Sequence, residues 1–301
     1  MTTIHQTPAT AAVDAAPAES GPVPTNKHRR RFPFGAAATV AVLGIFVFAP
    51  VYWVLVTALT PTNAVYEFPP RFWPRHLTLS HFTALVHTPV LLHYLVNSLV
   101  VSIATAVLTV IVSAYTGYSF AKFRYRGRRS LMYLILASQM FPQAVLLITL
   151  YLVFSQVGLL NSYLALILSF TTFTLPLCVW MMKGFFDTIP DELLEAAKVD
   201  GAGQFAIIHR ILLPVSLPGL VATGLFAFIR GWNDFIFALT LGGPDHLTLP
   251  PGLANHYIGE FETGWPELMA ASLVVSLPVV IGFAVLQRYL VAGLTSGAVK
   301  G

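Results

Sequence analysis

The sequence predicts an all-α integral membrane protein with six transmembrane helices. Three observations predict it: the composition is strongly apolar, six long apolar stretches recur along the chain, and the basic residues gather at one side of those stretches. Hydrophobic residues make up 56% of the 301 residues and charged residues only 10%, against about 25% charged residues in a typical soluble domain. Most of the chain therefore belongs in a bilayer.

The first 31 residues are rich in Ala, Thr and Pro and end in a basic run, 27–31. Such a segment cannot bury enough apolar surface to fold alone, so we expect a disordered basic tail over 1–31. A signal peptide is the alternative, because a basic stretch precedes an apolar one. The apolar stretch 36–59 is longer than the roughly 7–15 residues of a signal-peptide core, and no good cleavage site follows it, which favours a retained span.

Crossing about 30 Å of hydrocarbon takes about 20 helical residues. Stretches of this kind lie at 36–59, 94–118, 131–154, 161–184, 217–241 and 267–291. Small and hydroxyl residues recur along the second of them, namely Ser98, Ser102, Thr105, Ser113 and Gly117. Such residues let helix backbones approach closely inside a membrane, so we expect them to face other helices.

The positions of Lys and Arg predict the orientation. Of 17 such residues, only Arg71 and Arg75 fall in the predicted outer loops, and Arg230 falls inside a span. The rest lie in the tails or in the loops after the second and fourth stretches, which predicts both termini in the cytoplasm. The net charge of +4 does not indicate nucleic acid, because the basic residues form no continuous stripe. The single Cys178 allows no disulfide within the chain.

Four histidines in the first outer loop raise the question of a metal site: His76, His81, His87 and His93. Their spacings do not place pairs on one helix face, and no cluster of acids supports them. We therefore expect no metal site.

The loop between the fourth and fifth stretches has helix signals of its own. Thr188 and Asp191 have the spacing of a capping box, and Pro190 would fall in the first turn, where its missing N–H is harmless. These signals predict a short helix over 189–199.

Gly201 follows this helix and can end it in a left-handed conformation. A second short helix is expected over 203–212, stopped by Pro214 and Pro218. An elbow of this kind on the inner face is either a surface for docking another protein or a plain connection.

The residues of this elbow resemble a known signature. Glu195-Ala196-Ala197, then Gly201, then Ile211, Leu213 and Pro214 are similar to the EAA motif of ABC-importer permeases, and Asp200-Gly201-Ala202 is similar to its commonest version. The resemblance implies that the first short helix is a coupling helix, which sits in a cleft on the ATP-binding subunit. It implies that Glu195 makes the polar contact there, with Asp200 beside the turn. Ala196 and Ala197 would permit close approach, and Gly201 would give the turn. A solvated helix face is the alternative for Glu195.

The resemblance covers most of the chain. It implies a MetI-like core over 92–290, preceded by a first helix and outer loop over 32–91 and followed by a cytoplasmic tail over 291–301. Residues 293–301 and the sequence Trp232-Asn233-Asp234 resemble the maltose-type subunit of carbohydrate importers. The implied solute is a di- or oligosaccharide, with an amino acid, peptide or oxyanion as the alternative; the sequence does not indicate which sugar.

The resemblance also implies the partners. The chain lacks G-x-x-x-x-G-K-[ST], so ATP and Mg are expected on a partner ABC ATPase dimer and no cofactor on this chain. The other expected partners are a second six-span permease and an extracytoplasmic solute-binding protein. The maltose-type resemblance implies that the second permease is a different chain. The expected location of the assembly is the bacterial cytoplasmic membrane. An ion-coupled secondary transporter is a rival function, but it would not need the elbow motif. An intramembrane enzyme is another, but no H-E-x-x-H or serine–histidine pair supports it.

Candidate cavity residues lie in the fifth stretch. Arg230 and Asp234 are four residues apart, on one face of the expected helix. Charges within a membrane cost about 2.5–3.5 kcal/mol and usually face the bundle interior, so these two either line a cavity or form an ion pair that fixes packing. Trp232 and Asn233 would suit a sugar by stacking and hydrogen bonding, or would pack between helices.

Gln139 and Gln143 flank Pro142 in the third stretch, where the proline predicts a kink. Gating and static packing are both open as roles for the two glutamines.

Overall fold

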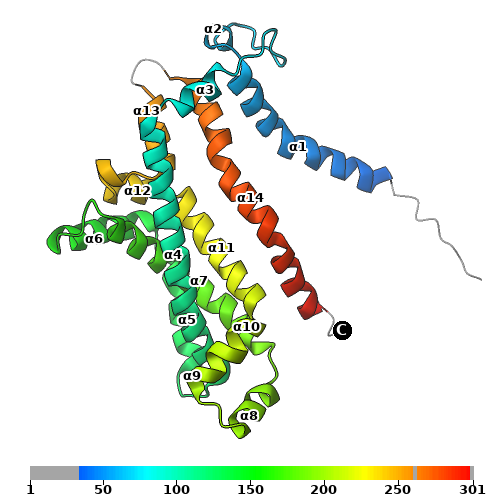
Figure 1. Ribbon diagram of the computed structural model, residues 1–301, viewed down its shortest axis with the longest axis vertical. Coiled ribbons are helices and arrows are strands. Elements are labelled where there is room, and N and C mark those ends of the chain that lie inside the picture. Colours follow the sequence, from blue (N-terminus) through cyan, green and yellow to red (C-terminus); the bar gives the residue numbers. More distant parts are fainter. Residues whose placement is uncertain (1–33, 260–262, 299–301) are drawn as a thin grey trace, which may run out of the picture. The chain divides into compact units, whose positions relative to one another are not determined.

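The computed structural model describes residues 34–259 and 263–298, and most of these residues are helical (Figure 1). The predicted basic tail 1–31 lies outside the described residues. The chain divides into two compact units, Met1–Phe48 and Ala49–Gly301. Helix α1 (Phe34–Leu59) begins in the first unit, and the features below belong to the second.

Three helices form the centre of the second unit. They are α4 (Pro89–Lys122), α7 (Tyr163–Asp187) and α11 (Leu217–Asn233), and each packs against the other two. Helix α14 (Trp265–Ala298) packs along α11 and also contacts the short helix α3 (Ser80–Val86). Helix α14 also contacts two further short helices, α2 (Thr62–Val65) and α13 (Leu249–Tyr257).

The small residues predicted to face other helices do so: all five, from Ser98 to Gly117, are buried along α4. A Cβ atom added to Gly117 would lie 2.8 Å from Cβ of Met182 on α7. Farther along α4, a Cβ added to Gly231 of α11 would lie 3.2 Å from Cα of Ser102. The close approach of these three helices therefore depends on residues without bulky side chains.

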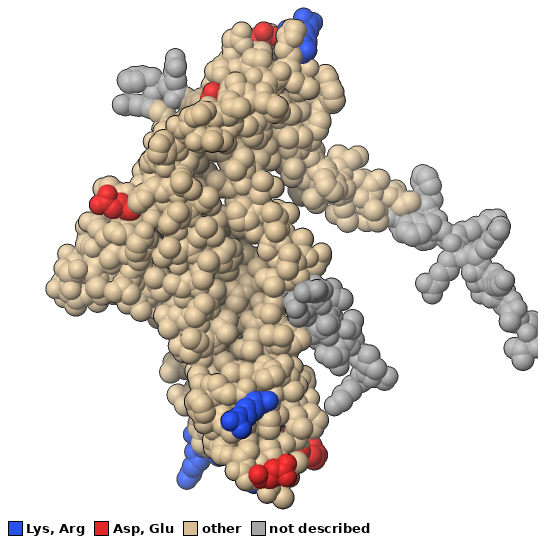
Figure 2. Space-filling view, in the orientation of Figure 1, with Lys and Arg blue, Asp and Glu red and all other residues tan. Residues whose placement is uncertain are grey.

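Four helices are individually long and apolar enough to cross a membrane, namely α1, α4, α7 and α14. Two bent pairs of helices are also long and apolar enough if each pair counts as one span: Arg128–Met140 with Gln143–Gln156, and Gln204–Val215 with Leu217–Asn233. The structure therefore has four to six candidate spans. The face in Figure 2 carries most of its charged side chains near its two ends, with uncharged surface between them. This distribution is typical of a protein that lies across a bilayer.

The third apolar stretch is broken, and the kink predicted at Pro142 is confirmed. Helix α5 (Arg128–Ala137) continues as a 3-10 turn to Met140, and α6 (Gln143–Gln156) leaves at 95° to it. The residue before a proline is disfavoured in the helical conformation. Phe141 is accordingly extended, with ψ 133°.

The fifth apolar stretch is also broken, so the expectation of one helix over 217–241 is wrong. Helix α11 ends at Asn233, Asp234 is extended with ψ 133°, and a separate helix α12 (Ile236–Leu241) follows. At the end of the chain, α14 continues to Ala298, through most of the segment that was expected to be a tail.

Candidate functional site

The elbow between α7 and α11 has the predicted helix–glycine–helix form. Helix α8 (Asp191–Val199) is followed by Gly201 in the left-handed conformation, with φ +81°. The second arm then runs without a break through α9 (Gln204–Ile207), a π-helical turn (Ile208–Leu212) and α10 (Leu213–Val215). Figure 1 shows the elbow beyond the ends of α4 and α7, opposite α3.

The predicted capping box at the start of α8 is wrong. Thr188 still has helical backbone angles at the end of α7, and its Oγ1 donates to the carbonyl oxygen of Phe185 at 2.7 Å. The hydroxyl therefore serves α7, and α8 starts after Pro190 without a side-chain cap.

The elbow has a buried face and an exposed face. Leu194 and Ala197 are buried together with residues of α4, α7 and the second arm. Glu195, Ala196 and Asp200 are exposed. Ala197 thus faces its own chain, and of the two alanines only Ala196 is available for close approach by another protein.

Exposed apolar side chains surround these polar residues. Val199 is 87% exposed and Phe205 71% exposed, and Leu193 is also exposed. Apolar side chains clustered beside acids on an exposed face are typical of a docking surface. The "coupling face" below means Leu193, Glu195, Ala196, Val199, Asp200 and Phe205.

Helix α4 holds both arms of the elbow through Tyr115, Tyr118 and Lys122. Tyr118 Oη donates to Oε1 of Gln204 at 2.8 Å. His209 Nδ1 lies 2.9 Å from the carbonyl oxygen of Phe205, so its Nε2 accepts from Tyr115 Oη at 3.0 Å.

Lys122 holds the first arm. Its Nζ donates to Oδ1 of Asp191 and to the carbonyl oxygen of Ile189, both at 2.6 Å. The hydrogen bond and charge of Lys122, followed by the charges of Arg124 and Lys198, lower the pKa of Asp191. Sequence reasoning missed these anchors; their signal is the spacing of three and four residues, which places Tyr115, Tyr118 and Lys122 on one face of α4.

Arg230 and Asp234 do not form the expected pair on one helix face. Asp234 lies beyond the end of α11, and its Oδ1 accepts from the backbone N–H groups of Phe237 at 2.9 Å and Ala238 at 3.3 Å. It therefore caps α12. Arg230 is exposed and makes no ion pair within the described residues.

Trp232 and Asn233 differ in how far they are exposed. Trp232 is only 4% exposed, and its ring stacks on Phe228 with centroids 5.5 Å apart. Its stacking face is thus taken by the protein. Asn233 is exposed, and both residues line a pocket of about 300 Å³ between α11, α13 and α14.

Sequence reasoning also missed Asn97, a fully buried polar residue on α4. Its Nδ2 donates to the carbonyl oxygens of Asp245 and Leu247, and its Oδ1 accepts from Tyr163 Oη at 2.6 Å. A single amide inside an apolar stretch was the available signal. Asn97 ties the segment before α13 to α4 and α7.

The two glutamines beside Pro142 differ. Gln139 Nε2 donates to the carbonyl oxygen of Phe173 on α7 at 2.8 Å, so it holds the bend in place. Gln143 is exposed at the start of α6.

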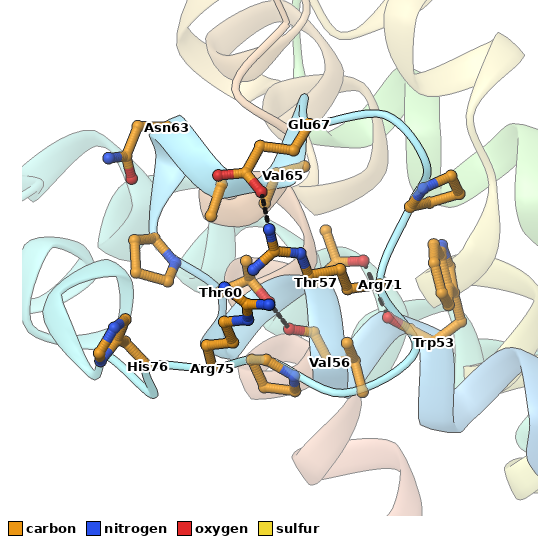
Figure 3. Close-up of a pocket in the computed structure, with 14 residues that line it drawn as sticks. Trp53, Val56, Thr57, Thr60, Asn63, Val65, Glu67, Arg71, Arg75 and His76 are labelled. Atoms are coloured by element: carbon orange, nitrogen blue, oxygen red, sulfur yellow. Dashed lines mark hydrogen bonds and ion pairs between the residues drawn. The ribbon is translucent and has the colours of Figure 1, made fainter.

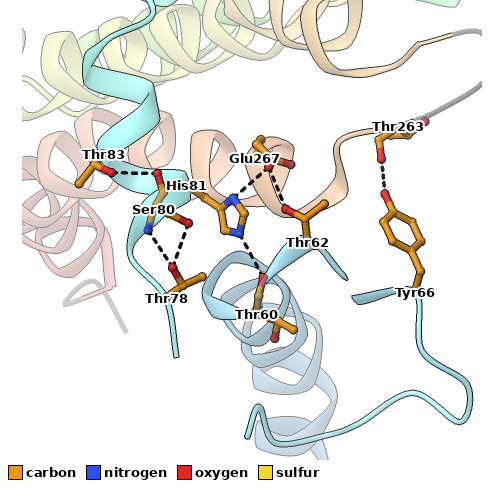
Figure 4. A network of polar contacts seen from close by, with 9 residues as sticks. All are labelled: Thr60, Thr62, Tyr66, Thr78, Ser80, His81, Thr83, Thr263 and Glu267. Atoms are coloured by element: carbon orange, nitrogen blue, oxygen red, sulfur yellow. Dashed lines mark hydrogen bonds and ion pairs between the residues drawn. The ribbon is translucent and has the colours of Figure 1, made fainter. Parts of the chain in front are cut away.

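His81, considered above as a metal ligand, belongs to a polar network instead (Figure 4). Its Nδ1 lies 3.0 Å from Oε1 of Glu267, and its Nε2 lies 3.1 Å from the carbonyl oxygen of Thr60. Thr62 Oγ1 donates to the same carboxylate. The described residues contain no group of three or more His, Cys, Asp or Glu side chains that could hold a metal ion.

Known proteins resemble this chain both at the level of the family and over nearly its whole length. Residues 110–296 match the family described as "Binding-protein-dependent transport system inner membrane component". The chain is 34% identical over 280 residues to the inner membrane ABC transporter permease protein YcjP of Escherichia coli, covering 92% of this chain and 99% of YcjP. It is 34% identical over 264 residues to the diacetylchitobiose uptake system permease protein DasC of Streptomyces coelicolor, covering 87% of this chain and 95% of DasC.

A solved structure has the same fold. A chain of a bacterial ABC transporter involved in the import of the acidic polysaccharide alginate superposes with a TM-score of 0.74 at 21% identity, covering 86% of this chain and 96% of that one.

Proposed function

The chain belongs to the family of binding-protein-dependent transport system inner membrane components, and from this premise we propose that it is the permease subunit of an ATP-driven ABC importer for a carbohydrate. The observation that carries the proposal is its match to ABC permeases over nearly its whole length. A di- or oligosaccharide is the proposed solute class, because one relative belongs to a diacetylchitobiose uptake system. The ATPase activity belongs to a separate subunit.

The proposed membrane arrangement has six spans and both termini in the cytoplasm. The apolar lengths of α1, α4, α7 and α14 support four of the spans, and the bent pairs supply the other two. The MetI-like core is placed at 92–290. The elbow then lies on the cytoplasmic side, together with most of the Lys and Arg residues.

The coupling face is the proposed contact with the ATPase dimer. Glu195 supplies a charge, Ala196 a place for close approach, and Val199 and Phe205 apolar surface. Movement of the elbow would be transmitted to α4, because Lys122 binds Asp191 on the first arm and Tyr118 binds Gln204 on the second. ATP binding and hydrolysis on the partner supply the free energy that shifts the permease between its two states.

The proposed solute path follows the exposed side of α11. Arg230 and Asn233 are exposed there, so they can meet a sugar or a second, different permease chain. Trp232 and Asp234 are proposed to support the structure around this path instead of binding the solute. The ring of Trp232 stacks on Phe228, and the carboxylate of Asp234 caps α12. An extracytoplasmic binding protein delivers the solute to the opposite side of the membrane from the elbow.

The test is purification of the tagged chain from its native membrane in mild detergent, followed by reconstitution into vesicles. We expect a P-loop ATPase and a second permease to co-purify, and uptake of a radiolabelled oligosaccharide to require ATP and the binding protein. Glu195→Lys should leave the amount of protein in the membrane unchanged and abolish ATP-driven uptake. Arg126→Glu, which reverses an exposed charge in the loop between α4 and α5, is the control. Transport by the chain alone, without ATP, would instead identify a secondary transporter.

A further inference from the structure

The segment that follows α1 folds back along the helix it has just left. Tyr52 Oη donates to the carbonyl oxygen of Phe72 at 2.7 Å, and the rings of Trp53 and Phe72 meet edge to face with centroids 5.7 Å apart. Helix α1 ends at Leu59. At about 1.5 Å of rise per residue, Phe72 lies roughly 10 Å below that end. Helix α1 is a candidate span by length and apolar composition, and a bilayer crossed by it would place Phe72 in the interfacial layer near that end.

The returning segment, residues 66–76, exposes large rings at this depth. Phe68 is 94% exposed, Phe72 73% and Trp73 72%. Three such rings in water would be an aggregation hazard, whereas aromatic rings are stable at a membrane interface. We call residues 66–76 the return loop.

A pocket of about 460 Å³ lies between the return loop and the end of α1 (Figure 3). Arg71 Nη2 pairs with Oε2 of Glu67 at 2.6 Å. Arg75 is exposed and makes no hydrogen bond or ion pair in the part of the chain that the structure describes. Figure 3 shows both arginine side chains pointing toward the same part of the pocket. Two guanidinium groups against one carboxylate leave one positive charge for an anion.

We propose that this pocket binds the phosphate of an anionic phospholipid in the adjacent leaflet, with Arg75 as its main ligand. A guanidinium binds phosphate through two parallel hydrogen bonds. The depth of the return loop favours a lipid over a soluble anion, because the exposed rings bring the pocket to the level where lipid phosphates lie. Arg71 contributes charge from beside Glu67. The proposal depends on α1 lying in a bilayer and not on the transported solute.

The test uses the full chain, with the subunits that co-purify with it, in phosphatidylcholine vesicles that contain a minor fraction of photoactivatable phosphatidylglycerol. After illumination, lipid adducts on the peptide that contains the return loop are counted by mass spectrometry. Arg75→Gln should reduce this labelling about fivefold, the effect of removing one basic residue near an anionic surface. Glu67→Gln should raise it, because the carboxylate that competes for Arg71 is gone.

Arg126→Gln is the matched control, since Arg126 is also exposed but lies in the loop between α4 and α5. It should leave labelling of the return loop unchanged. Equal labelling of the wild type and Arg75→Gln would overturn the proposal, and so would equal labelling by a photoactivatable phosphatidylcholine. Equal lipid labelling of the wild type and Arg75→Gln, with binding of soluble glycerol 3-phosphate to the wild type that is lost in Arg75→Gln, would show that the pocket binds free phosphate esters and not lipid.

Discussion

Lys122 at the end of α4 binds Asp191 at the start of α8, with Nζ 2.6 Å from Oδ1. The side chain of Lys122 is only 10% exposed, whereas that of Asp191 is 67% exposed. The contact therefore joins the packed interior of α4 to the outermost helix of the elbow. It links the helix that carries most of the coupling face directly to a membrane-spanning helix.

Replacing Lys122 by Gln should reduce ATP-driven uptake more than it reduces stability. A link that carries about 0.5–2 kcal/mol of coupling corresponds to a loss of roughly two- to thirtyfold in uptake. The rate is measured in vesicles, with thermal unfolding of the purified transporter as the stability readout. Lys183→Gln is the control, because Lys183 pairs with Asp187 within α7 and joins no two elements. Equal losses in the two variants would contradict a role for Lys122 in coupling.

The same contact predicts how uptake depends on pH. The hydrogen bond and charge of Lys122 lower the pKa of Asp191 in the folded protein. A lowered pKa means that the contribution of the ionised carboxylate is complete above the ordinary Asp value of about 3.9 and is lost only as pH falls through the lower folded value. The ratio of uptake by the wild type to uptake by Asp191→Asn should therefore stay constant between about pH 5 and pH 8. A ratio that changes in this window would show that Asp191 titrates there.

Gly201 should tolerate Asn better than Val. Its φ of +81° is open to glycine, acceptable to Asn and unfavourable for other side chains by about 1–2 kcal/mol. Nothing lies within 4 Å of a Cβ added there, so the effect is on the backbone alone. We expect Gly201→Val to lower uptake strongly and Gly201→Asn mildly, measured at equal protein levels. Gly203→Val is the control, because Gly203 also has open space but a φ of −70°. Similar losses of uptake in Gly201→Val and Gly203→Val would show that the left-handed turn at Gly201 is not the cause.

Gly117→Ala tests the crossing of α4 and α7. The new methyl group would lie 2.8 Å from Cβ of Met182 and 3.0 Å from the backbone nitrogen of Lys183. Because backbone atoms cannot move aside alone, the helices must separate, at about 1–3 kcal/mol. The purified transporter should unfold at a lower temperature than the wild type. Gly184→Ala on α7, where nothing lies within 4 Å, should not. An unchanged unfolding temperature for Gly117→Ala would mean that the crossing is looser than described.

The sequence was sufficient for features set by local chemistry. The burial of the small residues on α4, the bend at Pro142 and the left-handed Gly201 each follow from the residue type at that position. The anchors Tyr115, Tyr118 and Lys122 could not be predicted, because their partners lie about 70 to 90 residues away and are chosen by the packing of α4 against the elbow.

The wrong predictions for Thr188 and Asp234 have a common cause. Thr188 and Asp234 were each read in a single helix context, but each sits where one helix ends and another begins. At such a boundary the side chain bonds to whichever helix has unpaired backbone groups. Thr188 serves the helix before it, and Asp234 serves the helix after it.

Asp234 can be tested as a cap separately from any role of its charge. Its Oδ1 accepts from the N–H groups of Phe237 and Ala238 at the start of α12. An Asn side chain keeps an acceptor oxygen, so Asp234→Asn should retain most stability and uptake, whereas Asp234→Ala should lose about 0.5–2 kcal/mol of stability. Arg230 and Asp234 make no contact ion pair in the described residues, and the charge of Arg230 reaches Asp234 only through space, so the effects of Arg230→Gln and Asp234→Ala on stability should add to within about 0.5 kcal/mol. A coupling energy above about 0.5 kcal/mol between them, in a double-mutant cycle on the reconstituted transporter, would show that they interact, as in the ion pair that was one of the two alternatives from the sequence.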